Sequence, residues 1–109
     1  MDELKTREEV DAAFGREVAL VYKHSTLCPI SAAAQQQVNR YLQSNPDAPV
    51  YLLDVNTSRD ASRYVAERTG IEHHSPQAIL LRGGEAGWHS SHFDITAEAL
   101  EEQLGAAER

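Results

Sequence analysis

Cys28 is the residue with the clearest chemical potential, and it is the only cysteine in the 109-residue chain. It follows an apolar run at residues 18–22 and precedes good helix formers at residues 32–42. A thiol at the start of a helix faces unpaired N–H groups and the positive end of the helix dipole. Both features favour the thiolate, which is the nucleophilic form of cysteine. We therefore predict a reactive thiol and not an inert, small apolar residue.

The motif around this thiol is C-x-x-S, because Ser31 stands where a two-cysteine redox motif has its second thiol. A serine cannot resolve a mixed disulfide, although its hydroxyl can donate a hydrogen bond to the sulfur of Cys28. Such a chain attacks a disulfide and is then released by a thiol from another molecule. Pro29 fits the first helical turn, and we expect Thr26, Pro29 and Ser31 to support the thiolate. The alternative for Ser31 is a merely solubilising residue of that turn.

Histidines are the other titratable groups of interest. His24 lies four residues before the cysteine, and a protonated imidazole there, or the amine of Lys23, would lower the thiol pKa. The remaining histidines, expected in a loop or on opposite faces of one strand, show no metal-ligand spacing: His73, His74, His89 and His92. One cysteine also cannot supply a thiolate-rich zinc or iron–sulfur site within a single chain. We expect no metal site and no tightly bound cofactor.

The segments that position these residues alternate between strands and helices. A capping box at residues 6–9 starts the first helix, and residues 18–22 are apolar on both alternations, which suits a strand buried on both faces. Gly83–Gly87 predicts a hairpin connection. We expect helices within residues 6–14, 29–42, 58–69 and 96–104, and strands at residues 18–22, 50–55, 77–82 and 88–93.

The order α-β-α-β-α-β-β-α predicts one α/β domain over residues 1–109, with a central mixed four-stranded sheet flanked by helices. A cysteine after the first of these strands and a final hairpin are typical of the thioredoxin-like fold. By analogy with that fold, Ser75–Pro76 before the strand at 77–82 is expected to contain a cis peptide bond that faces Cys28. The main-chain groups of Ser75 would then be presented to a bound thiol partner.

The composition and charge of the chain argue against two kinds of partner and indicate a cellular compartment. The net charge is −7, and phosphate binding needs clustered Lys and Arg, so we expect no nucleic-acid partner. The first five residues are mostly charged and no apolar stretch reaches the length of a membrane span. We therefore expect no membrane association and a cytoplasmic protein that keeps its thiol reduced.

Three segments together resemble one protein family. The string K-H-S-T-L-C-P-I-S at residues 23–31 closely resembles the active-site segment of the YtxJ-like monothiol bacilliredoxins. Ser75-Pro76-Gln77 is similar to the family's proline segment, and residues 84–96 are similar to its C-terminal signature. The resemblance spans nearly the whole chain. Leu27 departs from the family pattern, because many relatives have a polar or basic residue at this position. We expect this difference to affect substrate preference more than the exchange chemistry.

The resemblance implies a thioredoxin fold and a role in bacillithiol redox homeostasis. Cys28 would be the attacking thiol and Pro76 the cis-proline of the substrate groove. Bacillithiol would be the co-substrate, and the partners would be S-bacillithiolated proteins, a low-molecular-weight thiol and a reductase. The candidates to hold the small thiol are the main-chain groups of two residues beside the proline and two residues near the last helix: Ser75, Gln77, Asp94 and Thr96.

Two other functions use the same motif. As in monothiol glutaredoxins, Cys28 from each of two chains would share an iron–sulfur cluster with two small thiols. Alternatively the chain is a redox sensor, in which oxidants modify Cys28 and a partner recognises the modification.

Overall fold

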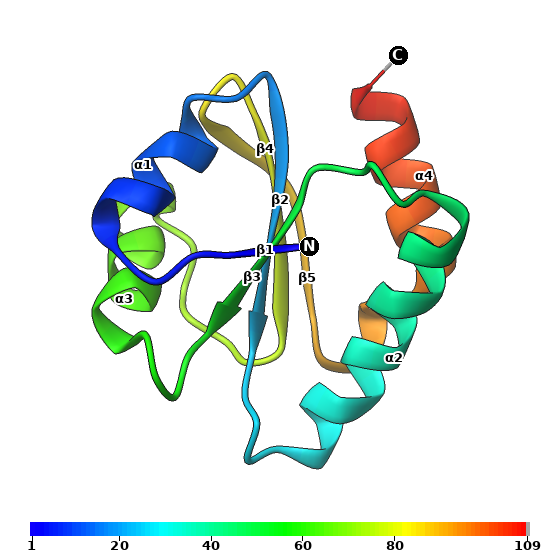
Figure 1. The fold of residues 1–109 in the computed structure, drawn as a ribbon, viewed down its shortest axis with the longest axis horizontal. Helices are drawn as coiled ribbons and strands as arrows, with labels where there is room; N and C mark the ends of the chain where they lie inside the picture. The colour runs from blue at the N-terminus through cyan, green and yellow to red at the C-terminus, as the bar shows by residue number, and fades with distance from the viewer. Residues whose placement is uncertain (109) are drawn as a thin grey trace.

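A mixed sheet of five strands forms the centre of the structure, a computed structural model that describes residues 1–108. The strands are β1 (Asp2–Glu3), β2 (Val18–His24), β3 (Val50–Asp54), β4 (Gln77–Arg82) and β5 (Glu85–Ser91). Their order across the sheet is β1-β3-β2-β4-β5 (Figure 1). β1 and β2 run parallel to β3, whereas β4 runs antiparallel to both β2 and β5. The predicted thioredoxin-like α/β architecture is confirmed.

Helices cover both faces of this sheet. They are α1 (Arg7–Phe14), α2 (Pro29–Ser44), α3 (Arg59–Thr69) and α4 (Ala97–Ala107), with a short 3-10 turn, η1 (His92–Asp94), before α4. α1 and α3 lie on one face, and α2 and α4 lie on the other (Figure 1). This layering places the start of α2 at the end of the sheet where β2 terminates.

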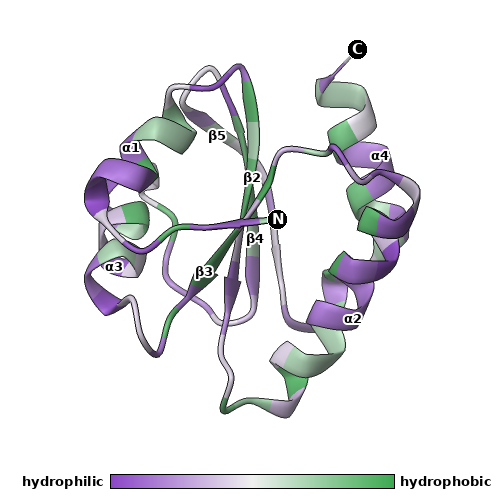
Figure 2. Cartoon of the chain, viewed as in Figure 1, coloured by the Kyte–Doolittle hydropathy of each residue, from purple (hydrophilic) through white to green (hydrophobic). Residues whose placement is uncertain are grey.

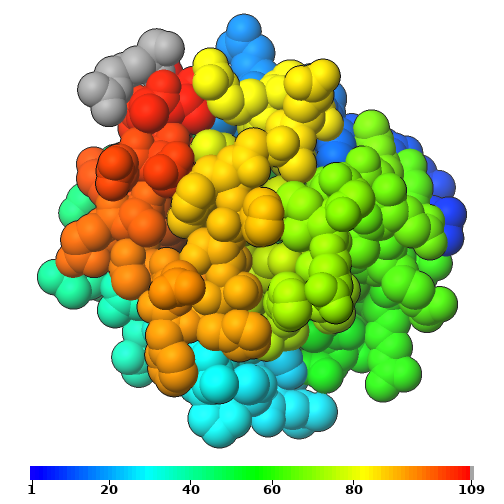
Figure 3. Space-filling model, turned by 180° about the vertical axis from the view of Figure 1, so that it is seen from behind, coloured from blue at the N-terminus to red at the C-terminus, as the bar shows by residue number. Residues whose placement is uncertain are grey.

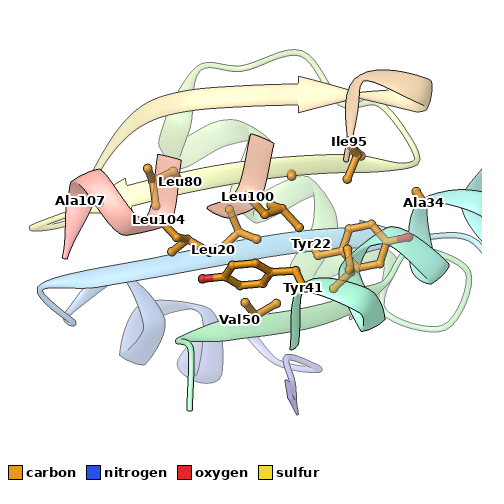
Figure 4. Close-up of a cluster of buried hydrophobic side chains, with 12 residues drawn as sticks. Leu20, Tyr22, Ala34, Tyr41, Val50, Leu80, Ile95, Leu100, Leu104 and Ala107 are labelled. Carbon is orange, nitrogen blue, oxygen red and sulfur yellow. The ribbon is translucent and has the colours of Figure 1, made fainter. Parts of the chain in front are cut away.

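β2 supplies side chains to two separate hydrophobic cores, because successive residues of a strand point to opposite faces. Leu20 and Tyr22 belong to the cluster beneath α2 and α4 (Figure 4). Ala19 and Val21 belong to the cluster beneath α1 and α3. In Figure 2 the central strands β2 and β3 are largely hydrophobic, whereas the helices alternate hydrophobic and hydrophilic residues. This pattern explains why residues 18–22 are apolar on both alternations.

The capping box predicted for the first helix is present. The Glu9 main-chain N–H donates to Thr6 Oγ1 over 3.1 Å, and the Thr6 N–H donates to Glu9 Oε1 over 3.2 Å. Each bond satisfies a main-chain donor that a helix start would leave unpaired. Thr6 therefore fixes where α1 begins.

The sheet has five strands and not the four expected from the sequence. The additional strand, β1, has two exposed, acidic residues, so it carries no apolar alternation that would mark a strand. It is aligned by parallel pairing with β3, and the Leu4 N–H donates to Leu52 O over 2.7 Å just beyond it. Leu4 is buried and anchors this edge.

Three boundaries near the C-terminus also differ. β5 ends at Ser91, and His92 has a left-handed backbone with φ 57°, so the expected placement of His89 and His92 on one strand is wrong. β5 also begins at Glu85, which shortens the hairpin connection to Gly83 and Gly84. α4 continues through Gly105 to Ala107, because packing of Leu104 and Ala107 on the core outweighs the helix-stopping tendency of the glycine.

We predict that Leu100→Ala lowers the free energy of unfolding by about 2–5 kcal/mol, because this fully buried side chain fixes α4 to the sheet. The matched control is Phe93→Ala, whose side chain is 71% exposed just before α4. The control should change stability by about 0.5 kcal/mol or less. Urea unfolding measures both, and equal losses in the two variants would contradict this account of the core.

Candidate functional site

Cys28 lies at the junction predicted from the sequence, as the N-cap residue of α2. β2 ends at His24, a short loop follows, and Pro29 occupies the first turn of the helix. The Cys28 backbone is extended, with φ −116° and ψ 122°, and its carbonyl accepts a 3.2 Å hydrogen bond from the Ala32 N–H. The thiol is partly exposed to solvent. A partner can therefore reach a sulfur that stands at the positive end of the helix dipole.

The helix start lowers the pKa of the Cys28 thiol. The main-chain N–H of Ser31 contributes most and that of Ile30 follows, while the Ser31 hydroxyl adds a smaller effect in the same direction. Desolvation acts in the opposite direction. Hydrogen bonds to the ionised form stabilise it relative to the neutral thiol. The thiolate is thus favoured by the local backbone and needs no neighbouring cation.

Ser31 is fully buried, so the alternative of a solvent-facing, solubilising serine is wrong. Its Oγ accepts a hydrogen bond from the Ser25 N–H over 3.2 Å, which leaves the hydroxyl proton available to the sulfur. Its carbonyl accepts a 3.2 Å bond from the Tyr22 hydroxyl, which is itself buried beneath α2. Ser31 therefore ties the helix start to both the preceding loop and the core.

Asn56 holds the loop before Cys28, and the sequence analysis missed it. Its Oδ1 accepts from Ser25 Oγ over 2.9 Å, from the Thr26 N–H over 3.0 Å and from Thr26 Oγ1 at 3.4 Å. The signal was available in the topology, because β2 and β3 are parallel neighbours with His24 opposite Asp54. The loops that follow two such strands meet at one edge of the sheet, so a polar residue after β3 was a candidate.

The two basic residues before the loop make other contacts. Neither His24 nor Lys23 is among the groups that lower the Cys28 pKa. His24 Nδ1 is 3.1 Å from the Tyr22 hydroxyl, and burial lowers the pKa of His24, with Asp54 acting in the opposite direction. Lys23 is fully buried, with its Nζ 3.1 Å from His73 Nδ1.

Ser75–Pro76 contains a cis peptide bond, as predicted. The Pro76 carbonyl accepts a 3.1 Å hydrogen bond from the His92 N–H, which joins this segment to η1. The side chain of Gln77 is buried, where it donates to Glu72 O over 3.0 Å and lies 3.5 Å from the His74 N–H. The buried Oγ of Ser75 has no hydrogen-bond partner within residues 1–108. Gln77 thus supports the loop from inside the protein.

The residues expected near the last helix lie on η1 and at its junction with α4. Asp94 is an exposed residue of η1. Thr96 is the N-cap of α4, and its Oγ1 accepts from the Ala99 N–H over 3.1 Å. η1 packs against α2, and in Figure 3 this orange segment lies beside the cyan start of α2. Both residues therefore stand at the end of the molecule that carries the thiol.

Two apolar side chains are exposed on segments that adjoin α2. Leu27, adjacent to Cys28, is 81% exposed, and Phe93 of η1 is 71% exposed.

Within the described part of the chain, no group of three or more His, Cys, Asp or Glu side chains is arranged to hold a metal ion. No helix in residues 1–108 is long and apolar enough to cross a membrane.

Comparisons with known proteins agree with this geometry. The family model for monothiol bacilliredoxin BrxC matches residues 2–100. A solved structure described as a candidate oxidoreductase with a thioredoxin fold is 35% identical, with 99% of this chain and 93% of that chain covered and a TM-score of 0.86. Mitochondrial thioredoxin 3 from Saccharomyces cerevisiae is 17% identical, with 97% and 94% covered and a TM-score of 0.75. Fasciola hepatica thioredoxin is 15% identical, with 98% and 99% covered and a TM-score of 0.75. The two thioredoxins show the fold alone.

We predict that Ser31→Ala raises the pKa of the Cys28 thiol only part of the way to its ordinary value, because two main-chain donors remain when the hydroxyl is lost. The measurement is the pH dependence of alkylation by iodoacetamide, which reacts with the thiolate. Ser44→Ala, an exposed change at the far end of α2, is the control and should leave the profile unchanged. A Ser31→Ala profile identical to that of the wild type would show that the hydroxyl does not act on the sulfur.

Proposed function

The chain belongs to the monothiol bacilliredoxin family of thioredoxin-fold oxidoreductases, and we propose that it removes bacillithiol from protein mixed disulfides. The family resemblance noted in the sequence is thereby confirmed. The observation that carries the proposal is the pairing of a stabilised thiolate at Cys28 with a buried serine at position 31. The first group attacks a disulfide, and the second cannot complete an internal one.

The reaction has two exchange steps. The Cys28 thiolate attacks the bacillithiol sulfur of the mixed disulfide, so that a Cys28–bacillithiol disulfide forms and the protein leaves as its thiolate. The thiolate of a second bacillithiol then attacks the bacillithiol sulfur of this adduct. Bacillithiol disulfide forms, and the Cys28 thiolate is the leaving group. The second bacillithiol supplies the reducing electrons, and the chain returns to its starting state.

The lowered pKa of the Cys28 thiol serves both steps. In the first it keeps a larger fraction of Cys28 as thiolate at neutral pH, and in the second it makes Cys28 a good leaving group. Ser75 and Pro76 are proposed to align the incoming disulfide, with the main chain of Ser75 as its hydrogen-bonding edge. Within residues 1–108 the Ser75 N–H and carbonyl make no other hydrogen bond. Main-chain groups of Gln77, with Asp94 and Thr96, are the weaker candidates to contact the small thiol.

We predict that the wild type, mixed with an excess of an S-bacillithiolated test protein, releases a single equivalent of reduced test protein and then stops. Addition of bacillithiol should restart turnover. Cys28→Ser should release none. Ser31→Cys should free bacillithiol without any added thiol, because the new thiol can resolve the adduct. Gel separation of reduced test protein and chromatography of free bacillithiol measure these outcomes.

Release that persists in Cys28→Ser would remove the proposal. No transfer by the wild type, with visible absorbance after anaerobic purification, would favour a shared iron–sulfur cluster instead. No transfer together with rapid sulfenylation of Cys28 would favour a redox sensor.

A further inference from the structure

Lys23 is buried without a counter-ion. Its side chain is fully inaccessible to solvent, and no carboxylate within residues 1–108 forms an ion pair with it. Strand alternation places it with Ala19 and Val21 on the face covered by α1 and α3, opposite the face that carries α2. Burial lowers its pKa to about 8. A buried amine without a counter-ion lowers the stability of the fold, which indicates that Lys23 has a function at this position.

The amine of Lys23 points to the loop before the cis-proline. Its Nζ lies 3.1 Å from Nδ1 of His73, and Ser62 Oγ of α3 lies 3.3 Å from the same nitrogen. Burial, followed by the charges of Lys23 and His74, lowers the pKa of His73. A neutral His73 that carries its proton on Nε2 has one acceptor lone pair at Nδ1, and the Lys23 amine is the closer of its two donors. The contact is thus a charge-assisted hydrogen bond from a strand to a loop.

A second buried side chain supports the same loop. Gln77 is the antiparallel ladder partner of Lys23 and is also nearly inaccessible. Its amide donates to Glu72 O, and its carbonyl oxygen lies 3.5 Å from the His74 N–H. The buried side chains of Lys23 and Gln77 therefore hold residues 72–74 in place from the interior of the protein. Ser75, the next residue, has no hydrogen bond of its own within residues 1–108 to fix its position.

We propose that Lys23 and Gln77 form a polar clamp that sets the conformation of residues 72–75 and thereby positions the Ser75 main chain for the disulfide partner of Cys28. This inference rests on the proposed function, because it assigns the clamp to the exchange reaction of that site. Lys23 acts through His73 and touches neither the sulfur nor the partner. It is a positioning residue.

The first test separates attack on a docked disulfide from reactivity of the thiol. Lys23→Met and His73→Leu should each slow exchange with a protein mixed disulfide by about tenfold, since small displacements of a positioning group are costly. Alkylation by iodoacetamide, which needs only the thiolate, should stay within about twofold of the wild type because the clamp does not touch the sulfur. His73→Asn keeps an acceptor near the Nδ1 position and should retain most of the exchange rate. The double variant Lys23→Met/His73→Leu should be no slower than either single variant, because both remove one contact.

The second test requires no disulfide substrate. Amide hydrogen exchange of residues 72–75 should be faster in Lys23→Met than in the wild type, while α2 is unchanged. If the wild type fails to exchange bacillithiol but Lys23→Met loosens this loop, the clamp stands and the proposed function fails. If Lys23→Met exchanges disulfides as fast as the wild type, slows exchange and alkylation alike, or leaves loop protection unchanged, the clamp is overturned.

A pH profile of stability checks the buried amine itself. Lys23 binds its proton up to about pH 8 in the folded chain and up to about 10.5 when unfolded. The unfolded chain therefore binds more protons between these values, and wild-type stability rises with pH across them. Within residues 1–108 the groups that face Lys23 include no carboxylate. They are His73 of the loop, with His74 beyond it, Ser62 of α3 and Gln77 of β4. The lowered pKa of Cys28 contributes a similar rise below pH 9.0, its ordinary value. Above pH 9.0 Lys23→Met should therefore lack the rise, and its presence there in the variant would assign it to another group.

Discussion

The main-chain N–H groups of Ile30 and Ser31 at the start of α2, which lower the pKa of the Cys28 thiol, are the feature on which the site depends. These donors exist because Pro29 begins the helix directly after the cysteine, and no intrahelical acceptor precedes them. Their direction is fixed by Ser31, which is bonded to Ser25 on one side and to Tyr22 on the other. Ser31 therefore connects the core beneath α2 and α4 to the start of the helix that carries the thiol. A site built this way lowers the pKa of its thiol without a nearby cation, in a chain whose net charge is −7.

The two faces of the sheet support different parts of the proposed reaction. The face beneath α2 supports the nucleophile through Tyr22 and Ser31. The face beneath α3 supports the loop before the cis-proline through Lys23 and Gln77. β2 contributes to both, because adjacent residues of one strand point in opposite directions. This division explains how a change under the loop can alter docking of a disulfide and leave the intrinsic reactivity of the thiol unchanged.

The sequence predicted the helices, the four long strands and the position of Cys28, because each has a local signal in periodicity or capping. The cis bond at Pro76 was predicted only by analogy with the thioredoxin-like fold. β1 was missed because two acidic residues carry no strand pattern and are aligned only by pairing with β3. Asn56 was missed because its role depends on two loops meeting after parallel strands. The burial of Ser31 and Lys23 was also beyond local patterns, since polar residues are normally exposed and only tertiary contacts reverse that preference.

The most direct test of the account is intact-mass spectrometry of the reduced chain, sampled over time after mixing with an S-bacillithiolated test protein. We expect a mass increase of one bacillithiol on Cys28, which appears together with reduced test protein and forms faster than the corresponding adduct from a glutathionylated protein. A chain that gains no adduct, or a test protein that is reduced while Cys28 stays unmodified throughout, would contradict it.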